Sequence, residues 1–181
     1  MNYTIEVLKP EEISALLALQ KENLKINLDT ETIDSQGFVT FVYNPEIIAD
    51  MMTEPQIIAK FDDTIIGYAL TTALTYARKM TLMRPLAELA ETLTYQNTPL
   101  SSLRYYIIGQ VCVRAGFRGI GVFDALYDGH RQLLASRYDC CITEIDWENK
   151  RSLAAHKRIG FEIIHEYFDP TSQKKLGSRF A

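Results

Sequence analysis

The chain has 181 residues, 47% hydrophobic and 23% charged, a balance typical of one globular domain with room for a small insertion. The formal net charge of −4 is unlike that of most nucleic-acid-binding proteins. The one short basic run, QKKLGSRF near the C-terminus, is expected to be a solvated tail. No stretch reaches the roughly 18–20 apolar residues that cross a bilayer. The sequence therefore predicts neither a nucleic-acid partner nor a membrane span.

The cysteines and the N-terminus indicate the compartment. The three cysteines are Cys112, Cys140 and Cys141, and an odd count with two adjacent members does not suit a secreted disulfide framework. The N-terminal MNYTIEVLKPEE lacks the charged and apolar regions of a signal peptide. We therefore expect a cytoplasmic protein with reduced thiols. Three scattered histidines and the lack of a Cys-x-x-Cys pair predict that no metal is bound.

The first half of the chain alternates between strand and helix patterns. Pro10 and two glutamates are typical of a helix start, and the residues that follow have helical apolar spacing. Two apolar runs separated by Asp62 and Asp63 predict an antiparallel hairpin. In order, we expect a strand at 3–8, a helix at 13–28, an ordered loop at 35–44, a short helix at 45–52, and hairpin strands at 56–61 and 64–74.

The second half begins with an expected insertion at 76–99, and two strand–helix units and a last strand follow. A helical segment at 82–93 is followed by a polar loop at 94–102. Apolar residues at 3.6-residue spacing predict a helix after the strand at 104–113. Its face is marked by Val122, Phe123, Leu126, Tyr127, Leu133 and Leu134. We then expect a strand at 140–147, a helix at 149–159 and a strand at 160–168. The whole chain, 1–181, is predicted to be a single mixed α+β domain.

Three glycines, Gly116, Gly119 and Gly121, lie within six residues directly after the strand at 104–113. A mononucleotide P-loop is excluded because apolar residues follow Gly121 where Lys and Ser or Thr would stand. A dinucleotide fingerprint is excluded because Asp124 fills its third glycine position. Two interpretations remain: a tight strand-to-helix turn, or an anion site built from backbone N–H groups and the helix dipole.

The glycine cluster resembles the acetyl-CoA-binding motif of the GNAT superfamily of N-acetyltransferases, Gln/Arg-x-x-Gly-x-Gly/Ala. The stretch VRAGFRGIGVF places Arg118 first and Gly121 fourth, with Phe123 where Gly or Ala is usual. A second stretch, NKRSLAAHKRIGF, is similar to the family's later signature. It keeps the spacing of Asn149 and Gly160, with His in place of the family's Tyr.

This resemblance covers roughly residues 57–168 and implies both a fold and a cofactor. The implied fold has a mixed, mostly antiparallel sheet with a splayed central strand pair and helices on both faces. Acetyl-CoA would be the co-substrate, its pantetheine arm beside the strand backbone and its pyrophosphate on the glycine loop. Asn149 would reach the pantetheine or cap the next helix. The implied cofactor-binding residues are Val111, Cys112, Val113, Arg118, Gly119, Ile120, Gly121, Val122, Phe123, Asn149 and Ser152.

The chemistry implied by the resemblance is direct attack of an amine on a thioester. His156 is the candidate that protonates the departing thiolate, or that only orients the thiol. Glu144 and Asp146 alternate on one strand and so share a face, and Glu144 is preferred as the general base. Gln110 is a candidate for orienting water or substrate. The Cys112 thiol is expected to be a small buried strand residue rather than a nucleophile.

The sequence thus predicts an N-acetyltransferase that moves acetyl from acetyl-CoA to a primary amine in a ternary complex. The expected acceptor is a small-molecule or protein amine, with the small molecule preferred, and a homodimer is left open. Two alternatives stand beside this prediction. One is a non-catalytic acyl-CoA-binding or regulatory module of the same fold, and the other is a nucleotide-binding protein that uses the same glycine turn.

Overall fold

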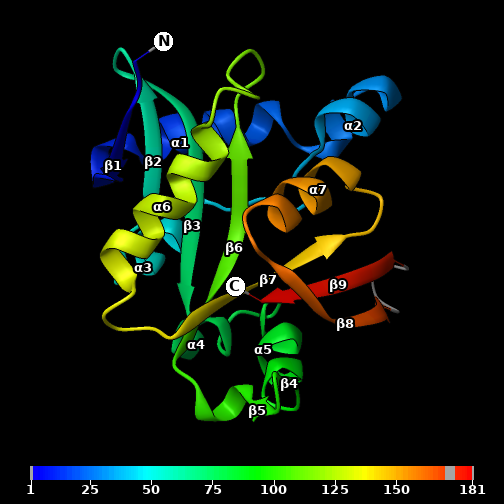
Figure 1. The fold of residues 1–181 in the computed structure, drawn as a ribbon. Coiled ribbons are helices and arrows are strands. Elements are labelled where there is room, and N and C mark those ends of the chain that lie inside the picture. The colour runs from blue at the N-terminus through cyan, green and yellow to red at the C-terminus, as the bar shows by residue number, and fades with distance from the viewer. Residues whose placement is uncertain (1, 170–173, 181) are drawn as a thin grey trace. The chain divides into compact units, whose positions relative to one another are not determined.

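The computed structural model describes residues 2–169 and 174–180 (Figure 1). Its backbone divides into two compact units. The first unit comprises residues 1–71 and 110–134, and the second comprises residues 72–109 and 135–181. Strands β3 (Thr64–Ala73) and β6 (Tyr105–Val113) each continue from one unit into the other. No helix in the described part of the chain has the length and apolarity needed to span a bilayer.

The first unit contains part of the sheet and four α-helices. Its strand order is β1-β2-β3-β6, and β1 to β3 are antiparallel neighbours. The hairpin turn at Asp62 and Asp63 is confirmed, with Asp62 at a φ of 44°. The remaining elements are β1 (Thr4–Val7), α1 (Ile13–Glu22), α2 (Thr30–Gln36), α3 (Pro45–Met51), β2 (Ile57–Phe61) and α6 (Val122–Leu134).

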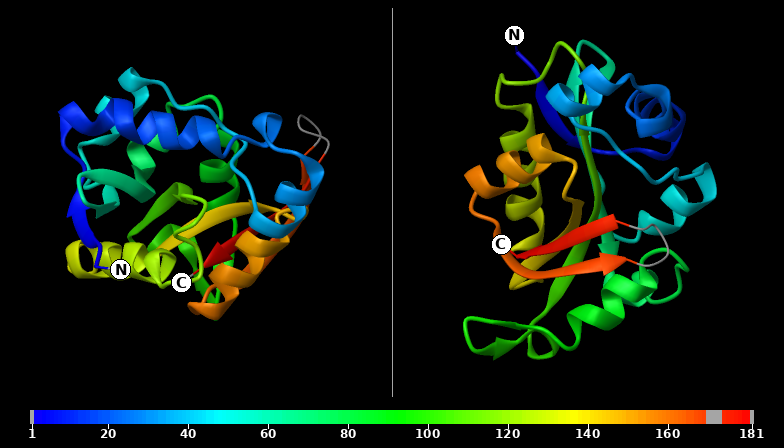
Figure 2. Two further views of the ribbon diagram at one scale, coloured as in Figure 1. Left: turned by 90° about the horizontal axis from the view of Figure 1, so that it is seen from above. Right: turned by 90° about the vertical axis from the view of Figure 1, so that its right-hand side faces the viewer.

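Helices cover both faces of the strands in the first unit. Figures 1 and 2 show α6 on one face and α1 with α3 on the other. Val122 and Leu126 of α6 join a buried cluster with Ile57 and Ile66. Leu133, expected on this buried face, is instead 46% exposed. Polar His130 is buried on that helix, because backbone and hydroxyl oxygens on β3 lie within hydrogen-bond reach of its ring.

Helix α6 approaches β1 and β2 closely at Gly129. A Cβ atom there would lie 2.9 Å from Cγ2 of Ile5 and 3.0 Å from Cγ2 of Ile57. We expect Gly129→Ala to destabilise the protein by about 1 kcal/mol. Overpacking costs about 1–3 kcal/mol, and a gain of about 1 kcal/mol in helix propensity offsets part of it. Urea unfolding measures the change, with the exposed Asp128→Ala on the same helix as control; a stabilised Gly129→Ala would contradict the close approach.

The second unit contains the rest of the sheet. Its strand order is β6-β7-β9-β8, with β7 parallel to β6 and the other pairs antiparallel. The β6–β7 ladder runs over three residue pairs and ends at Ile107 and Ile142, although both strands continue. The other elements are α4 (Leu74–Ala77), α5 (Arg84–Ala90), β4 (Thr94–Tyr95), β5 (Thr98–Pro99), β7 (Cys140–Asp146), α7 (Lys150–Arg158), β8 (Glu162–Asp169) and β9 (Lys174–Phe180).

Several parts of the chain differ from the sequence prediction. The helix expected at 13–28 ends at Glu22, as α1. The basic run expected to be a solvated tail forms β9, because β7 and β8 both offer it hydrogen-bonding partners. The polar loop at 94–102 contains the small hairpin β4–β5, whose two turn residues have positive φ: Gln96 at 47° and Asn97 at 65°. Helix α2 was not predicted, although Asp29 caps it by accepting from the Thr32 amide. The mixed, mostly antiparallel α+β class is confirmed.

Candidate active site

The loop from Arg114 to Gly121, which joins β6 to α6, owes its shape to glycine backbone freedom. Gly116, Gly119 and Gly121 have φ values of 85°, 79° and 91°, a region that residues with a Cβ rarely adopt. Nothing lies within 4 Å of a Cβ built on the first two. Gly116 and Gly119 are therefore required by conformation and not by packing, and the backbone on their side is open, whereas a Cβ on Gly121 would lie 3.3 Å from the Tyr3 hydroxyl.

The N-terminus of α6 follows this loop directly. The Ala125 amide donates to the Gly121 carbonyl and closes the first turn. The first N–H groups of any α-helix have no partner within the helix, and its dipole is positive at this end, so an anion is stabilised there. The Phe123 ring packs on Tyr127, with ring centroids 5.1 Å apart. The sixth position of the motif, where Gly or Ala is usual, therefore holds an aromatic ring that packs along the surface of α6.

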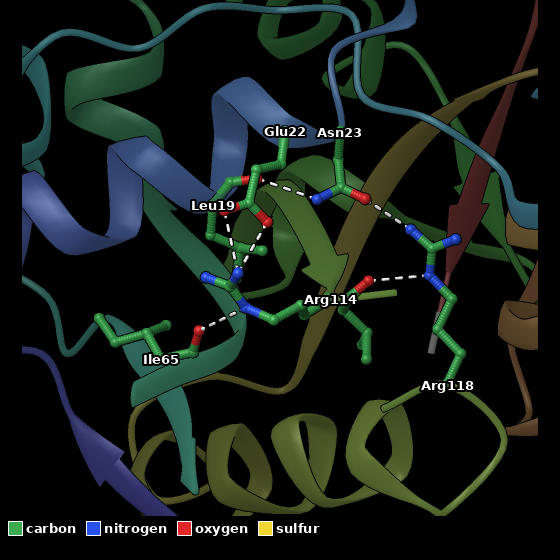
Figure 3. A network of polar contacts seen from close by, with 7 residues as sticks. Leu19, Glu22, Asn23, Ile65, Arg114 and Arg118 are labelled. Atoms are coloured by element: carbon green, nitrogen blue, oxygen red, sulfur yellow. Dashed lines mark hydrogen bonds and ion pairs between the residues drawn. The ribbon is translucent and has the colours of Figure 1, made fainter. Parts of the chain in front are cut away.

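Two arginines fasten the loop to the end of α1 (Figure 3). Arg114 donates to both carboxylate oxygens of Glu22 at 2.9 Å and to the Ile65 carbonyl at 3.3 Å. Arg118 donates to the Val113 carbonyl at 2.8 Å and to the Asn23 side chain. Its guanidinium, which sequence reasoning assigned to the cofactor only by motif position, is thus tied to protein oxygens.

Sequence reasoning missed Glu22 and Asn23. They lie about ninety positions before their arginine partners, and they read as the polar end of an amphipathic helix. The available signal was that a residue at the end of a helix is shielded from solvent where a loop packs on it. Asn23 is indeed only 4% exposed. Only the tertiary fold brings it to the loop.

The strand residues before the loop have mostly structural side chains. Cys112 is buried, and burial raises the pKa of its thiol to about 12, so it is a poor nucleophile, as expected. Val113 is buried and Val111 is half-buried. Their proposed contact with pantetheine would use backbone groups, and the Val113 carbonyl already accepts from Arg118.

Gln110 anchors a neighbouring loop. Its Oε1 accepts from Gln20 at 3.1 Å and from the Tyr68 hydroxyl at 2.6 Å. Its Nε2 donates to the Phe41 carbonyl at 3.0 Å, and the Tyr43 amide donates to Gln20. These bonds hold the loop at 37–44 against β6. Gln110 thus has a structural role beside the expected one of orienting water or substrate, which stays a prediction.

In the second unit, Asn149 begins α7 as its N-cap. It is 7% exposed, and its Oδ1 accepts from the Ser152 amide at 3.2 Å. This is the capping alternative left open by the sequence. Ser152 is half-buried on the first turn, where its hydroxyl lies 3.3 Å from Nδ1 of His156.

His156 is 1% exposed and has a defined hydrogen-bond geometry. Its Nδ1 lies 2.8 Å from the Ser152 carbonyl, which can only accept, so Nδ1 carries the proton. The Phe161 ring meets the imidazole edge-on at 5.1 Å. The hydrogen bond from Nδ1 to the Ser152 carbonyl fixes the orientation of the ring on its own helix.

Glu144 and Asp146 share one face of β7, as alternation predicts, and Ile145 between them is buried. Asp146 accepts from the Glu148 amide at 2.9 Å and so shapes the end of the strand. Glu144 accepts from the Tyr167 hydroxyl on β8. Sequence reasoning missed Tyr167, which stacks on His165, with ring centroids 5.9 Å apart. The alternation of His165 and Tyr167 on the strand expected at 160–168 was the available signal.

The predicted site residues thus fall into two groups. The first unit brings together the loop, the start of α6 and the end of β6. The second unit brings Asn149, Ser152 and His156 onto one helix and holds Glu144 on β7. In the described residues, no three His, Cys, Asp or Glu side chains gather so as to hold a metal ion.

Comparison with known proteins identifies the fold. No family model matches the sequence, and no curated protein matches it. Solved structures match along nearly the whole chain. Arabidopsis thaliana Naa50 in complex with the bisubstrate analogue CoA-Ac-MVNAL is 15% identical, with a TM-score of 0.64 and coverage of 100% of this chain and 99% of that one. Arabidopsis thaliana NAA60 in complex with acetyl-CoA is 12% identical, with a TM-score of 0.64 and 99% coverage of both chains.

An acetyltransferase of the GNAT family from Streptococcus pneumoniae is 11% identical, with a TM-score of 0.63 and coverage of 99% of this chain and 98% of that one. At such identities the likeness concerns the fold. The chain has the fold of the GNAT N-acetyltransferases, which confirms the fold implied by the resemblance.

Proposed function

We propose that the protein is an N-acetyltransferase that moves acetyl from acetyl-CoA to a primary amine. One observation carries the proposal. In a GNAT fold, a loop with three positive-φ glycines and open backbone leads directly into the N-terminus of a 13-residue helix. Such a turn suits a pyrophosphate, whose oxygens need close approach to backbone N–H groups. The phosphates would lie against the amides of residues 118–123, and the pantetheine along residues 111–113.

The proposed reaction is direct acyl transfer in a ternary complex. Glu144 takes a proton from the ammonium form of the acceptor, directly or through water. The neutral amine nitrogen then bonds to the thioester carbonyl carbon, the C–S bond breaks, and the nitrogen sheds its second proton to water to leave the neutral amide. The thiolate of CoA takes a proton from water or from an imidazolium form of His156. Neutral His156 would instead orient the thiol through Nε2. Tyr167, by donating to Glu144, holds the carboxylate in place.

We propose that the acceptor is a small-molecule or protein amine. The sequence favoured a small molecule, whereas the bisubstrate analogue bound to Naa50 carries a peptide. Both classes belong in the first screen. We also propose a cytoplasmic location, supported by three cysteines that are free thiols in the structure.

Thermal unfolding with acetyl-CoA, CoA, NAD and ATP in parallel tests the cofactor. A ligand at a hundred times its dissociation constant adds about 2.7 kcal/mol to the folded state, which for this length raises the midpoint by roughly 5–10 °C. We expect that rise with acetyl-CoA and CoA. No rise with either, or a larger one with NAD or ATP, would contradict the proposal. Amines are then screened for release of free CoA.

A second candidate is an acyl-CoA-binding module without turnover. It is favoured by the buried His156, which replaces the family's tyrosine and bonds to its own helix. Binding of acetyl-CoA without CoA release for any small-molecule or peptide amine would support this candidate.

A further inference from the structure

The positive charge of Arg118 would suit contact with a phosphate, whereas its hydrogen bonds suit a residue that holds the loop in place. Each of its three guanidinium nitrogens donates to a neutral oxygen: Nε to Val113, Nη1 to Gln36 at 3.0 Å, and Nη2 to Asn23. Arg114, four residues earlier, is instead paired with the Glu22 carboxylate. Three acceptors, one for each guanidinium nitrogen, fix the orientation of the planar group.

Asn23 is itself held from every side. Its amide donates to the Gln20 carbonyl at 3.0 Å, and its carbonyl accepts from the Val39 amide at 2.9 Å. Its side-chain Nδ2 donates to the Leu19 carbonyl at 2.9 Å. With Nδ2 committed, Oδ1 has one direction, and it points to Arg118 (Figure 3). The acceptor is therefore fixed before the loop meets any ligand.

A loop with three positive-φ glycines has more conformations to lose than an ordinary loop, so a ligand that needs one conformation binds weakly unless the loop is held. The only side chain of the FRGIG segment that could tie its middle to the body of the unit by charged hydrogen bonds is Arg118. Its partners on α1 and α2 supply the fixed points.

We propose that Asn23 and Gln36 are positioning residues that hold the anion-binding loop through Arg118, so that they set the affinity for CoA without touching it. This inference rests on the proposed function, because it concerns the same loop and the same ligand. It also assigns Arg118 the role of a tether, in contrast to direct contact with the phosphates through its side chain.

Calorimetric titration of CoA into the wild type and Asn23→Leu tests the inference. We expect Asn23→Leu to weaken CoA binding about tenfold, within the range found for residues that share a hydrogen-bond network. Asn23→Asp keeps an acceptor for Arg118 and is expected to retain most of the affinity. The matched control is Asn27→Ala, because Asn27 also donates to a carbonyl of α1, that of Lys21 at 2.7 Å, but has an exposed side chain. It should bind CoA as the wild type does.

A double-mutant cycle separates the tether from direct phosphate contact. Arg118→Lys keeps the positive charge and loses the planar fork. If Arg118 acts as a tether, Arg118→Lys should weaken CoA binding as much as Asn23→Leu does. The double variant should then bind CoA little more weakly than either single variant. Direct contact predicts that Arg118→Lys keeps most of the affinity and that Asn23→Leu has a small, additive effect, which would overturn the inference.

Two further results keep the outcomes distinct. If Asn23→Leu fails to fold, Gln36→Leu replaces it in the test. Gln36 is half-buried and accepts from Arg118, and its loss is expected to weaken CoA binding severalfold. Unchanged binding in Gln36→Leu and in Asn23→Leu would overturn the inference. Absence of CoA binding by the wild type would instead overturn the proposed function.

Discussion

Glu144→Gln is expected to lower turnover by about 100- to 10,000-fold, the usual contribution of a positioned general base. The amide keeps the size of the side chain and its hydrogen-bonding oxygen for the Tyr167 hydroxyl, but it cannot accept the proton of an ammonium. Steady-state CoA release measures the effect, with acetyl-CoA affinity determined separately. The affinity should be unchanged, since Glu144 is assigned to the amine and not to the cofactor.

Glu148→Gln is the matched control, because Glu148 is an exposed glutamate just after the same strand. It is expected to turn over at the wild-type rate. The deficit of Glu144→Gln should also shrink as pH rises above the pKa of the acceptor amine, about 7.7–8.0 for an α-amine, because the neutral amine then needs no base to remove its first proton. A full rate in Glu144→Gln at neutral pH would remove Glu144 from the mechanism.

The second large effect concerns stability and the buried His130. Burial lowers the pKa of this imidazole to about 4. Nε2 donates a hydrogen bond to the Ala69 carbonyl at 3.1 Å, and Thr71 Oγ1 lies 3.3 Å from Nδ1. Below about pH 6.5 the unfolded chain binds a proton on this ring that the folded chain does not bind until about pH 4. The contribution of neutral His130 to the free energy of unfolding is therefore fully present above pH 6.5 and is lost as pH falls toward 4.

A pKa change of this size corresponds to about 3 kcal/mol. Urea unfolding at pH 7 and pH 4 should show that the wild type loses about 3 kcal/mol more than His130→Gln, which keeps a side-chain donor but does not titrate. The carboxylates are common to both proteins, so the difference isolates His130. Parallel pH dependences in the two proteins would show that the imidazole does not cause the loss.

Several features of the candidate site could be predicted because they depend on local sequence. The glycine spacing after a β-branched strand requires a turn with positive φ, and the three glycines have it. Alternation on a strand is a period of two, so Glu144 and Asp146 had to share a face. The Asn before a helical segment favoured a cap, and Asn149 is one.

Other features could not be predicted, because they depend on residues far apart in the chain. A helix-forming sequence does not show which loop will lie beside its polar end, so Asn23 and Glu22 gave no sign of their arginine partners. A lone histidine on a helix shows neither its burial nor its tautomer, and for His156 both follow from Ser152 and Phe161 after folding. A basic segment with few apolar residues is typical of a solvated tail. Its pairing with β7 and β8, which makes it β9, depends on strands that are adjacent only in the folded chain.

The sequence by itself determined the order of most strands and helices, the glycine turn, and the residues with which a GNAT-like site would be built. The order of the elements and the turn follow from periodicity and from backbone freedom, which are local, and the site residues follow from the resemblance of two short motifs to the GNAT family. The tertiary structure decided which polar groups are committed: Arg118 to neutral oxygens of α1 and α2, Gln110 to the loop at 37–44, and Glu144 to Tyr167. The reason is that a buried polar group must find a partner, and that partner is fixed by packing rather than by distance along the chain.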